Sequence, residues 1–264
     1  MSSMEIELVM FTVLSQSAIG LVLMSSVRQY AVEGPAGNVR SEWIVAGAIL
    51  LLGLIASFFH LGHPLGAINA IKHIGSSWLS REAVGISLFL ALVAAGIFSS
   101  GERIKFGLAV GACFMGLLAL FFTGMTYAPP GYPALYNVLP LVFFVLTAVT
   151  VGTAFSSYFA PEVYIRTLAA VLAAALVVSL VVYLVVPLVW LSGGTVMSQT
   201  GIQHLTSPLY WGKIILGLVI PLGAVAMTRS IPYWVPVLII IGEFMGRIAF
   251  FALSVHASSN IGGL

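Results

Sequence analysis

Cysteine, aspartate and charged residues of either sign are scarce in this sequence of 264 residues. The single cysteine, Cys113, stands in an apolar run, which excludes a disulfide framework and a cysteine-ligated iron–sulfur cluster within the chain. All eight acidic residues are glutamates, and ten lysines and arginines leave a net charge of only +2. The sequence therefore has no basic face for nucleic acid, and no nucleic-acid partner is predicted.

Apolar residues make up 60% of the chain and charged residues 7%, which is outside the range of ordinary soluble domains. Because a membrane-spanning helix needs about 20 residues, this composition allows about eight spans. The predicted fold is all-α: a polytopic membrane protein whose eight transmembrane helices form a bundle in the lipid bilayer, as a single integral membrane domain over residues 1–264. The predicted spans are 5–30, 43–63, 82–99, 104–127, 134–159, 165–191, 209–229 and 233–256.

Basic residues predict the orientation of these spans. Six of them border the breaks after the first, third, fifth and seventh spans, and three border the opposite breaks. Since cytoplasmic loops carry the excess of lysine and arginine, the first group is predicted to be cytoplasmic and both termini periplasmic, in a bacterial inner membrane. The first group is Arg28, Arg40, Arg103, Lys105, Arg166 and Arg229, and the second is Lys72, Arg81 and Lys213.

The densest group of titratable side chains lies in one break, from His60 to Glu82. Polar groups at a membrane face are costly unless they serve a purpose, so this break is the first place to expect chemistry. His60 and His63 are three residues apart and share a helix face. They can accept protons from a hydroxylated ring, since the pKa of histidine is close to neutrality. The alternative is that they only bond a loop carbonyl.

Glu82 opens the predicted third span two residues after Ser80, which is the predicted N-cap. One interpretation is structural, because a carboxylate favours the positive end of a helix dipole. The other is that Glu82 takes the second proton of a two-proton oxidation, with Lys72 and His73 as secondary pocket residues. Arg81 is predicted to pair with Glu82 or with a docked partner.

Glu243 and Arg247 lie four residues apart inside the last predicted span. Charges at that depth must pair, so a structural ion pair is predicted, with a contribution to a cofactor pocket as the alternative. A different class of function, a secondary transporter, would use this pair as its coupling site. A haem-containing quinol anchor is a further alternative. It is disfavoured because no two histidines lie mid-membrane on separate helices, and no metal ligands are predicted.

Two motifs resemble those of the membrane anchor subunit of dimethyl sulfoxide reductase, the DmsC family. The first is His-Leu-Gly-x-Pro-Leu at 60–65, followed by Asn69, Ile74-Gly75 and Leu79-Ser80-x-Glu82. The second is Gly-Glu-x-x-Gly-Arg-x-x-Phe at 242–250. The likeness covers the whole length, since members of that family are also chains of eight helices of similar size.

The resemblance implies a membrane anchor that oxidises menaquinol in anaerobic respiration and has no haem of its own. It implies an iron–sulfur subunit as the electron acceptor and a molybdopterin catalytic subunit beyond it. It also implies that His60 and Glu82 are the quinol-site residues, with His63, Lys72, His73 and Arg81 around them. The residues and the resemblance together predict a menaquinol-oxidising anchor.

Overall fold

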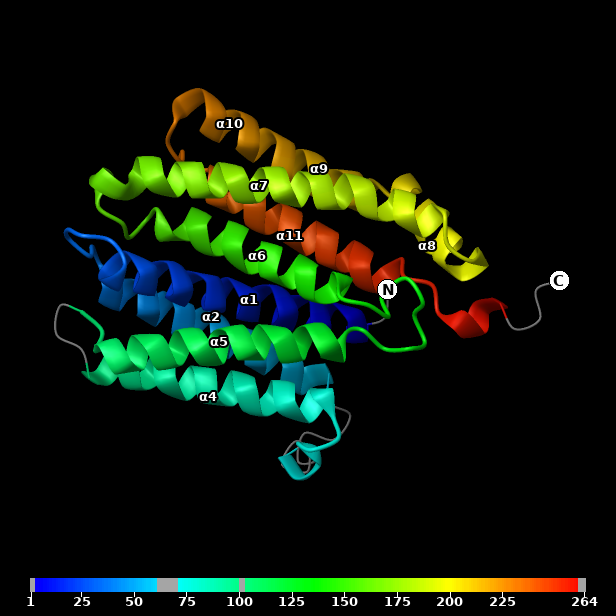
Figure 1. The fold of residues 1–264 in the computed structure, drawn as a ribbon, viewed down its shortest axis with the longest axis horizontal. Coiled ribbons are helices and arrows are strands. Elements are labelled where there is room, and N and C mark those ends of the chain that lie inside the picture. Colours follow the sequence, from blue (N-terminus) through cyan, green and yellow to red (C-terminus); the bar gives the residue numbers. More distant parts are fainter. Residues whose placement is uncertain (1–2, 61–70, 100–102, 261–264) are drawn as a thin grey trace.

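The computed structural model describes residues 3–60, 71–99 and 103–260. Eight helical segments in these ranges are long and apolar enough to cross a membrane, which confirms the predicted fold class (Figure 1). The chain is a multi-pass membrane protein. Seven spans are the single helices α1 Ser3–Tyr30, α2 Val39–His60, α4 Trp78–Ser99, α5 Phe106–Thr126, α6 Leu139–Ser156, α7 Glu162–Leu191 and α11 Val235–Ala252. The remaining span, which is seventh in chain order, consists of α9 Pro208–Ile214, the π-helical turn η3 Ile215–Val219 and α10 Ile220–Thr228.

The bundle has two distinct ends because successive spans run in opposite directions (Figure 1). We call one the arginine end: it holds the segments 31–38, 103–105, 157–161 and 229–234, at the left of Figure 1. We call the other the histidine end: it holds the short helices η2 Ile71–His73, α8 Thr195–Thr206 and η4 Ala257–Asn260, and the segment 127–138. Helix α8 lies in a break for which no helix was predicted.

Helix α1 lies at the centre of the bundle and packs against α2, α5, α6 and α11. Its central position follows from small residues that let another helix approach its backbone. A Cβ atom at Gly20 would collide with the Ala148 carbonyl oxygen of α6, and one at Gly152 would collide with Gly20. The two helices therefore touch through their backbones, as small residues permit in membrane bundles.

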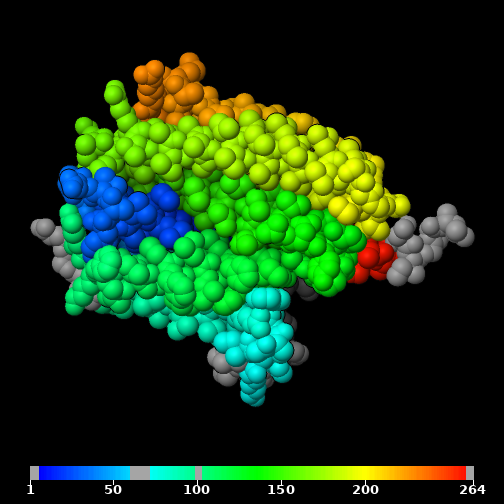
Figure 2. All heavy atoms as spheres, viewed as in Figure 1, coloured from blue at the N-terminus to red at the C-terminus, as the bar shows by residue number. Residues whose placement is uncertain are grey.

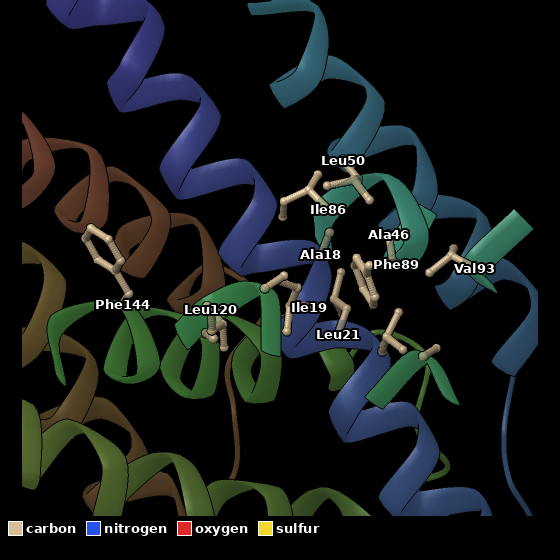
Figure 3. Packing of buried hydrophobic residues seen from close by; sticks show 14 of the residues in the cluster. Ala18, Ile19, Leu21, Ala46, Leu50, Ile86, Phe89, Val93, Leu120 and Phe144 are labelled. Carbon is tan, nitrogen blue, oxygen red and sulfur yellow. The ribbon is translucent and has the colours of Figure 1, made fainter. Parts of the chain in front are cut away.

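Buried side chains from α1, α2, α4, α5 and α6 form the main apolar core (Figure 3). On α4 the buried positions Ile86, Phe89 and Val93 recur at spacings of three and four, which is one face of a helix. Glu82 stands four residues before Ile86 and continues the same buried face. Glu82 is therefore part of the packed interface of α4.

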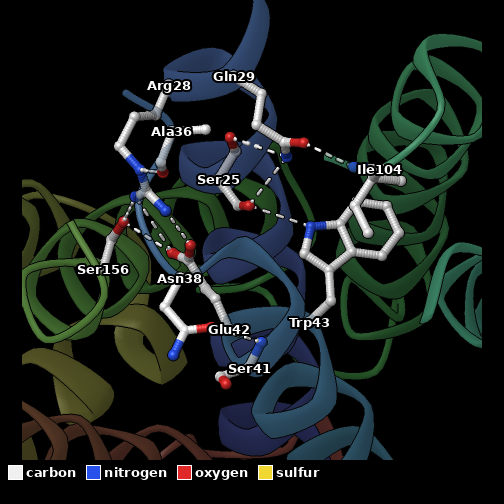
Figure 4. Close-up of polar contacts among 10 residues, drawn as sticks. All are labelled: Ser25, Arg28, Gln29, Ala36, Asn38, Ser41, Glu42, Trp43, Ile104 and Ser156. Carbon is white, nitrogen blue, oxygen red and sulfur yellow. Dashed lines mark hydrogen bonds and ion pairs between the residues drawn. The ribbon is translucent and has the colours of Figure 1, made fainter. Parts of the chain in front are cut away.

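A polar network joins three spans at the arginine end (Figure 4). The Arg28 guanidinium of α1 pairs with the Glu42 carboxylate of α2. Arg28 also donates to the Ala36 carbonyl oxygen at 2.7 Å and to the Ser156 hydroxyl of α6 at 2.6 Å. The Ser156 hydroxyl in turn donates to Glu42 at 2.8 Å. Each charge in this network has partners from another helix, so it holds α1, α2 and α6 together.

Candidate functional site

Glu82 lies one turn inside α4 at the histidine end. The helix begins at Trp78, because the Ser77 hydroxyl accepts the backbone N–H of Ser80 at 3.4 Å. The prediction that Ser80 is the N-cap is therefore wrong, and the predicted third span begins four residues too late. The Glu82 side chain is only 2% exposed. Its carboxyl group is buried between helices, and both interpretations of its role, structural and functional, stay predictions.

The Glu82 carboxyl group has no hydrogen-bond partner on either oxygen among the described residues. Thr123 and Thr126 of α5 lie beside it, but neither hydroxyl has the distance and angle of a normal hydrogen bond to it, and that of Thr126 donates to the Phe122 carbonyl oxygen at 2.9 Å. A buried polar group without a partner is costly in an apolar interior. Among the described residues, both acceptor oxygens thus lack a hydrogen bond of normal geometry.

Close contact between α4 and α5 creates this buried position. A Cβ atom at Gly85 would lie 3.4 Å from the Ala119 Cα and 3.2 Å from the Phe122 ring, so the two helices approach closely one turn below Glu82. At the helix start, the Trp78 ring packs edge-on against Phe121, with 5.8 Å between centroids. Trp78 is one turn before Glu82 on α4, so aromatic rings lie on the side of Glu82 toward the histidine end.

Tyr127 follows the last residue of α5 and is the next polar group near Glu82. Its ring packs edge-on against Phe144 and Phe251, at centroid distances of 5.7 and 5.2 Å. Burial and the neighbouring Glu82 carboxylate raise the pKa of Tyr127 well above its usual value, while Arg247 acts in the opposite direction. The Tyr127 hydroxyl therefore keeps its proton at neutral pH and remains a hydrogen-bond donor.

Arg81 does not pair with Glu82. Its guanidinium donates to the carbonyl oxygens of Ile74 and Gly75, at 2.9 and 2.7 Å, and lies 4.3 Å from the centroid of the Trp78 ring. The first of its two predicted roles, pairing with Glu82, is therefore wrong, and docking of a partner stays a prediction. Arg81 fastens the segment after η2 to the start of α4.

Lys72 and His73 lie on η2, which projects from the bundle next to the start of α4 (Figure 2). Both side chains are exposed. The described residues contain no group of three or more histidine, cysteine, aspartate or glutamate side chains that could hold a metal ion. The two residues are placed for contact with the aqueous phase or with a partner, and their role in a quinol pocket stays a prediction.

His60 is the last residue of α2, and α2 ends at the same end of the bundle where α4 begins. Helices α2 and α4 are in contact. The backbone thus brings His60 and Glu82 to one end of two neighbouring helices, as the motif predicted. His63 lies outside the described residues, and the roles of both histidines stay predictions.

A second buried polar cluster joins α9, α11, α6 and α1. The Lys213 ammonium pairs with the Glu243 carboxylate, which also accepts the Thr147 hydroxyl at 2.8 Å. Arg247 donates to that hydroxyl at 3.0 Å and to the Gln16 side-chain oxygen at 2.7 Å. The predicted direct ion pair between Glu243 and Arg247 is therefore wrong, because Thr147 stands between them. We call these five residues the lysine–glutamate cluster.

Sequence reasoning missed Lys213 as a buried group and counted it among the basic residues at the membrane surface. It is 1% exposed. The signal was present, because Lys213 lies within the predicted span 209–229 rather than beside it. The pattern did not predict its partner, Glu243, which is 30 residues further along the chain.

Comparison with known proteins identifies the family. The model of the family described as "DMSO reductase anchor subunit (DmsC)" matches residues 1–207, most of the chain. This chain belongs to the DmsC family. The matched part of this DmsC-family protein includes Glu82 and its neighbours on α4 and α5, and it ends before Lys213, Glu243 and Arg247. The predicted resemblance is thereby confirmed.

Three relatives of this DmsC-family protein are named as parts of oxidoreductases. It is 40% identical over 90 residues to the anaerobic dimethyl sulfoxide reductase chain YnfH of Escherichia coli, covering 32% of this chain and 31% of that one. It is 30% identical over 161 residues to the C chain of the anaerobic dimethyl sulfoxide reductase of Haemophilus influenzae, covering 58% and 57%. A third match, 48% over 50 residues, is to the C subunit of the sulfite dehydrogenase of Allochromatium vinosum, covering 19% and 15%. The alignments thus span about a third and about a half of the two reductase chains.

Proposed function

We propose that this DmsC-family protein oxidises menaquinol beside Glu82 and passes the electrons to an iron–sulfur subunit, which feeds a molybdopterin catalytic subunit in anaerobic respiration. The observation that carries the proposal is the buried Glu82 carboxyl group, whose two oxygens have no hydrogen bond of normal geometry to any described residue. A quinol hydroxyl is a hydrogen-bond donor attached to an apolar ring, and it suits an acceptor in an apolar, aromatic setting. Thr126 and Tyr127 offer further hydroxyls for orienting it.

The chemistry requires two proton acceptors and one electron acceptor. Oxidation of a quinol to a quinone releases two protons and two electrons. The Glu82 carboxylate takes one proton and becomes a neutral acid. His60, at the end of α2, takes the other. The electrons go to a cluster of the partner, because one cysteine cannot ligate a cubane cluster.

Exposed basic residues support an orientation with this site on the outer face. Arg28 and Lys213 are buried in ion pairs and no longer count as interfacial charges. Among the described residues, the exposed or half-exposed cations that remain are five at the arginine end and two at the histidine end. They are Arg40, Arg103, Lys105, Arg166 and Arg229 against Lys72 and Arg81. By the positive-inside rule, the arginine end faces the cytoplasm of a bacterial inner membrane and both termini face the periplasm.

The test is the substitution Glu82→Gln in the complex that co-purifies with this chain. Reduction of the partner's iron–sulfur clusters by a soluble menaquinol analogue should fall by about a hundredfold or more, the usual range for loss of a general base. Reduction of the same clusters by a viologen dye should be unchanged. The matched control is Glu162→Gln, which alters an exposed glutamate at the arginine end.

Two results would contradict the proposal. One is quinol-linked reduction at the wild-type rate in the Glu82→Gln complex. The other is a protein that purifies without any iron–sulfur partner and drives uptake of a solute, as the transporter alternative requires. A visible spectrum of the purified protein separates the haem alternative, since a bound haem would absorb strongly.

A further inference from the structure

The lysine–glutamate cluster carries more positive than negative charge. It contains two cations, Lys213 and Arg247, and one carboxylate, Glu243, and these three side chains are 1%, 4% and 3% exposed. A guanidinium does not lose its proton in proteins. The cluster is therefore neutral when Lys213 is an amine, and it carries one positive charge when Lys213 is an ammonium.

Both forms of the cluster have compensating contacts. The ammonium form has the ion pair with Glu243 and lies 5.2 Å from the centroid of the Tyr183 ring. In the amine form, Glu243 keeps the hydroxyl of Thr147, which links it to Arg247, and that of Thr150 at 3.3 Å. An excess charge in the membrane is costly, and a broken ion pair is costly as well. Each form therefore avoids one of these two costs and carries the other.

A cavity lies directly beside the cluster and is large enough for a water molecule. Its volume is about 20 Å³, whereas one water needs roughly 10 to 15 Å³ on the same measure. Tyr183 of α7, Tyr210 of α9 and Arg247 of α11 line it together with His204 of α8. Arg247 points a buried Nη1 at no partner among the described residues. The cavity is thus lined by a charged residue that has one donor without a partner among the described residues.

His204 supplies a hydrogen-bond acceptor, in contrast to the donor of Arg247. Its Nδ1 is bonded to the Thr200 carbonyl oxygen at 2.9 Å, so Nδ1 carries the proton and Nε2 is left as an acceptor. Burial lowers the pKa of His204 to about 4, and the imidazole is neutral at pH 7. A water in the cavity can therefore accept from Arg247 and donate to His204. Three polar groups around one site are what a buried water requires, and the Tyr183 hydroxyl is the third.

Gly246 lines the cavity and also lies against the Lys213 side chain. A Cβ atom at this position would lie 3.0 Å from the Lys213 Cγ and 3.4 Å from the Tyr183 hydroxyl oxygen. The glycine is thus the point where the lysine stem, the tyrosine hydroxyl and the cavity wall meet. The other titratable groups around Lys213 are those already named: Arg247, Tyr183, Tyr210 and His204.

We infer that Lys213 and Glu243 form a proton-exchange site, connected to the histidine end of the bundle through water in the cavity that Gly246 lines. In one direction the Lys213 ammonium gives a proton to this water and becomes an amine; in the other it regains the proton, so the net charge of the cluster changes by one. The site is distinct from Glu82, and the inference does not rest on quinol oxidation.

The test follows the Glu243 carboxylate by infrared difference spectroscopy on the full chain in lipid nanodiscs, between about pH 5 and about pH 10.5, a range that includes the usual titration of lysine. The wild-type spectrum should contain a carboxylate band that changes with pH, and Glu243→Gln should remove that band. Lys213→Arg should keep the band but abolish its change, because a guanidinium preserves the ion pair without titrating. Lys72→Arg, at an exposed lysine, is the matched control and should behave like wild type.

Gly246→Ala tests the route, because it removes no titratable group. After a rapid pH step, the band should change more slowly in this variant and reach the same final spectrum. An unchanged wild-type band across the range, or an equal change in Lys213→Arg, overturns the exchange site. Wild-type kinetics in Gly246→Ala overturns the cavity as its route. None of these three results bears on the Glu82 experiment, so the two proposals can fail separately.

Discussion

Glu42 and Glu82 are both buried glutamates near the start of a spanning helix, and their surroundings are opposite. Glu42, at the arginine end, is 0% exposed and holds an ion pair with Arg28 and the hydroxyl of Ser156. Glu82, at the histidine end, is 2% exposed and has no hydrogen-bond partner among the described residues. The difference separates a carboxylate that the fold uses to join helices from one that no described residue bonds with normal geometry.

The same contrast extends to the groups around each glutamate. At the arginine end, the Gln29 amide donates to Ser25 and accepts from the Ile104 backbone N–H at 2.9 Å, and the Trp43 indole donates to Ser25 at 3.1 Å (Figure 4). Around Glu82 the neighbouring Thr126 hydroxyl bonds its own helix instead. Buried polar networks specify structure when they are complete, so the incomplete one is the better candidate for binding.

The largest effect should come from breaking the complete network. Glu42→Ala leaves Arg28 buried and uncompensated, and it should lower the free energy of unfolding by about 3 to 5 kcal/mol. The measurement is chemical unfolding of the purified protein in detergent. Glu33→Ala, at an exposed glutamate of the same end, is the matched control and should change the free energy by about 0.5 kcal/mol or less. Equal values for the two variants would mean that the ion pair does not hold the helices.

A smaller effect should appear with pH at the histidine end. The pKa of His204 is about 4 in the folded chain, against an ordinary value of 6.5, because burial disfavours the charged form. Below pH 6.5 the unfolded chain binds a proton that the folded chain does not, so the free energy of unfolding falls as the pH drops and stops falling near pH 4. From pH 7 to pH 5 the loss should be about 2 kcal/mol.

The variant His204→Asn isolates this contribution, because asparagine can still donate to the Thr200 carbonyl oxygen but does not titrate. The difference in pH dependence between wild type and His204→Asn, measured by thermal or chemical unfolding, should equal the loss given above. His73→Asn, at an exposed histidine on η2, is the matched control for loss of an imidazole. A wild-type curve from His204→Asn would mean that this imidazole is not protected from protonation.

The smallest effect on stability should come from Glu82 itself. Glu82→Gln removes no hydrogen bond and no ion pair among the described residues, so the free energy of unfolding should change by less than about 1 kcal/mol. Melting of the purified protein measures this directly. A large destabilisation would place Glu82 with Glu42 as a structural residue, and loss of quinol activity in the same variant would then be explained by the fold.

Much of the architecture was predictable from local pattern. Eight spans were correctly expected, since apolar runs of about 20 residues need no knowledge of their neighbours. The predicted boundaries were less accurate. Helices α2 and α4 each begin four residues before the predicted position. The side chains of Asn38 and Ser77 cap them by accepting the backbone N–H groups of Ser41 and Ser80. Helix α8 was missed because its residues Thr195–Thr206 lack a long apolar run.

The sequence by itself determined that this protein spans the membrane eight times and that His60 and Glu82 come to the same end, because the number of apolar runs and the alternation of their directions fix both. Only the tertiary structure decided which buried charges have partners. Lys213 rather than Arg247 pairs with Glu243, and Arg28 pairs with Glu42. Glu82 has no hydrogen-bond partner of normal geometry among the described residues. The physical reason is that an ion pair between helices depends on how their faces are turned toward each other, and that rotation is set by packing between segments far apart in the sequence.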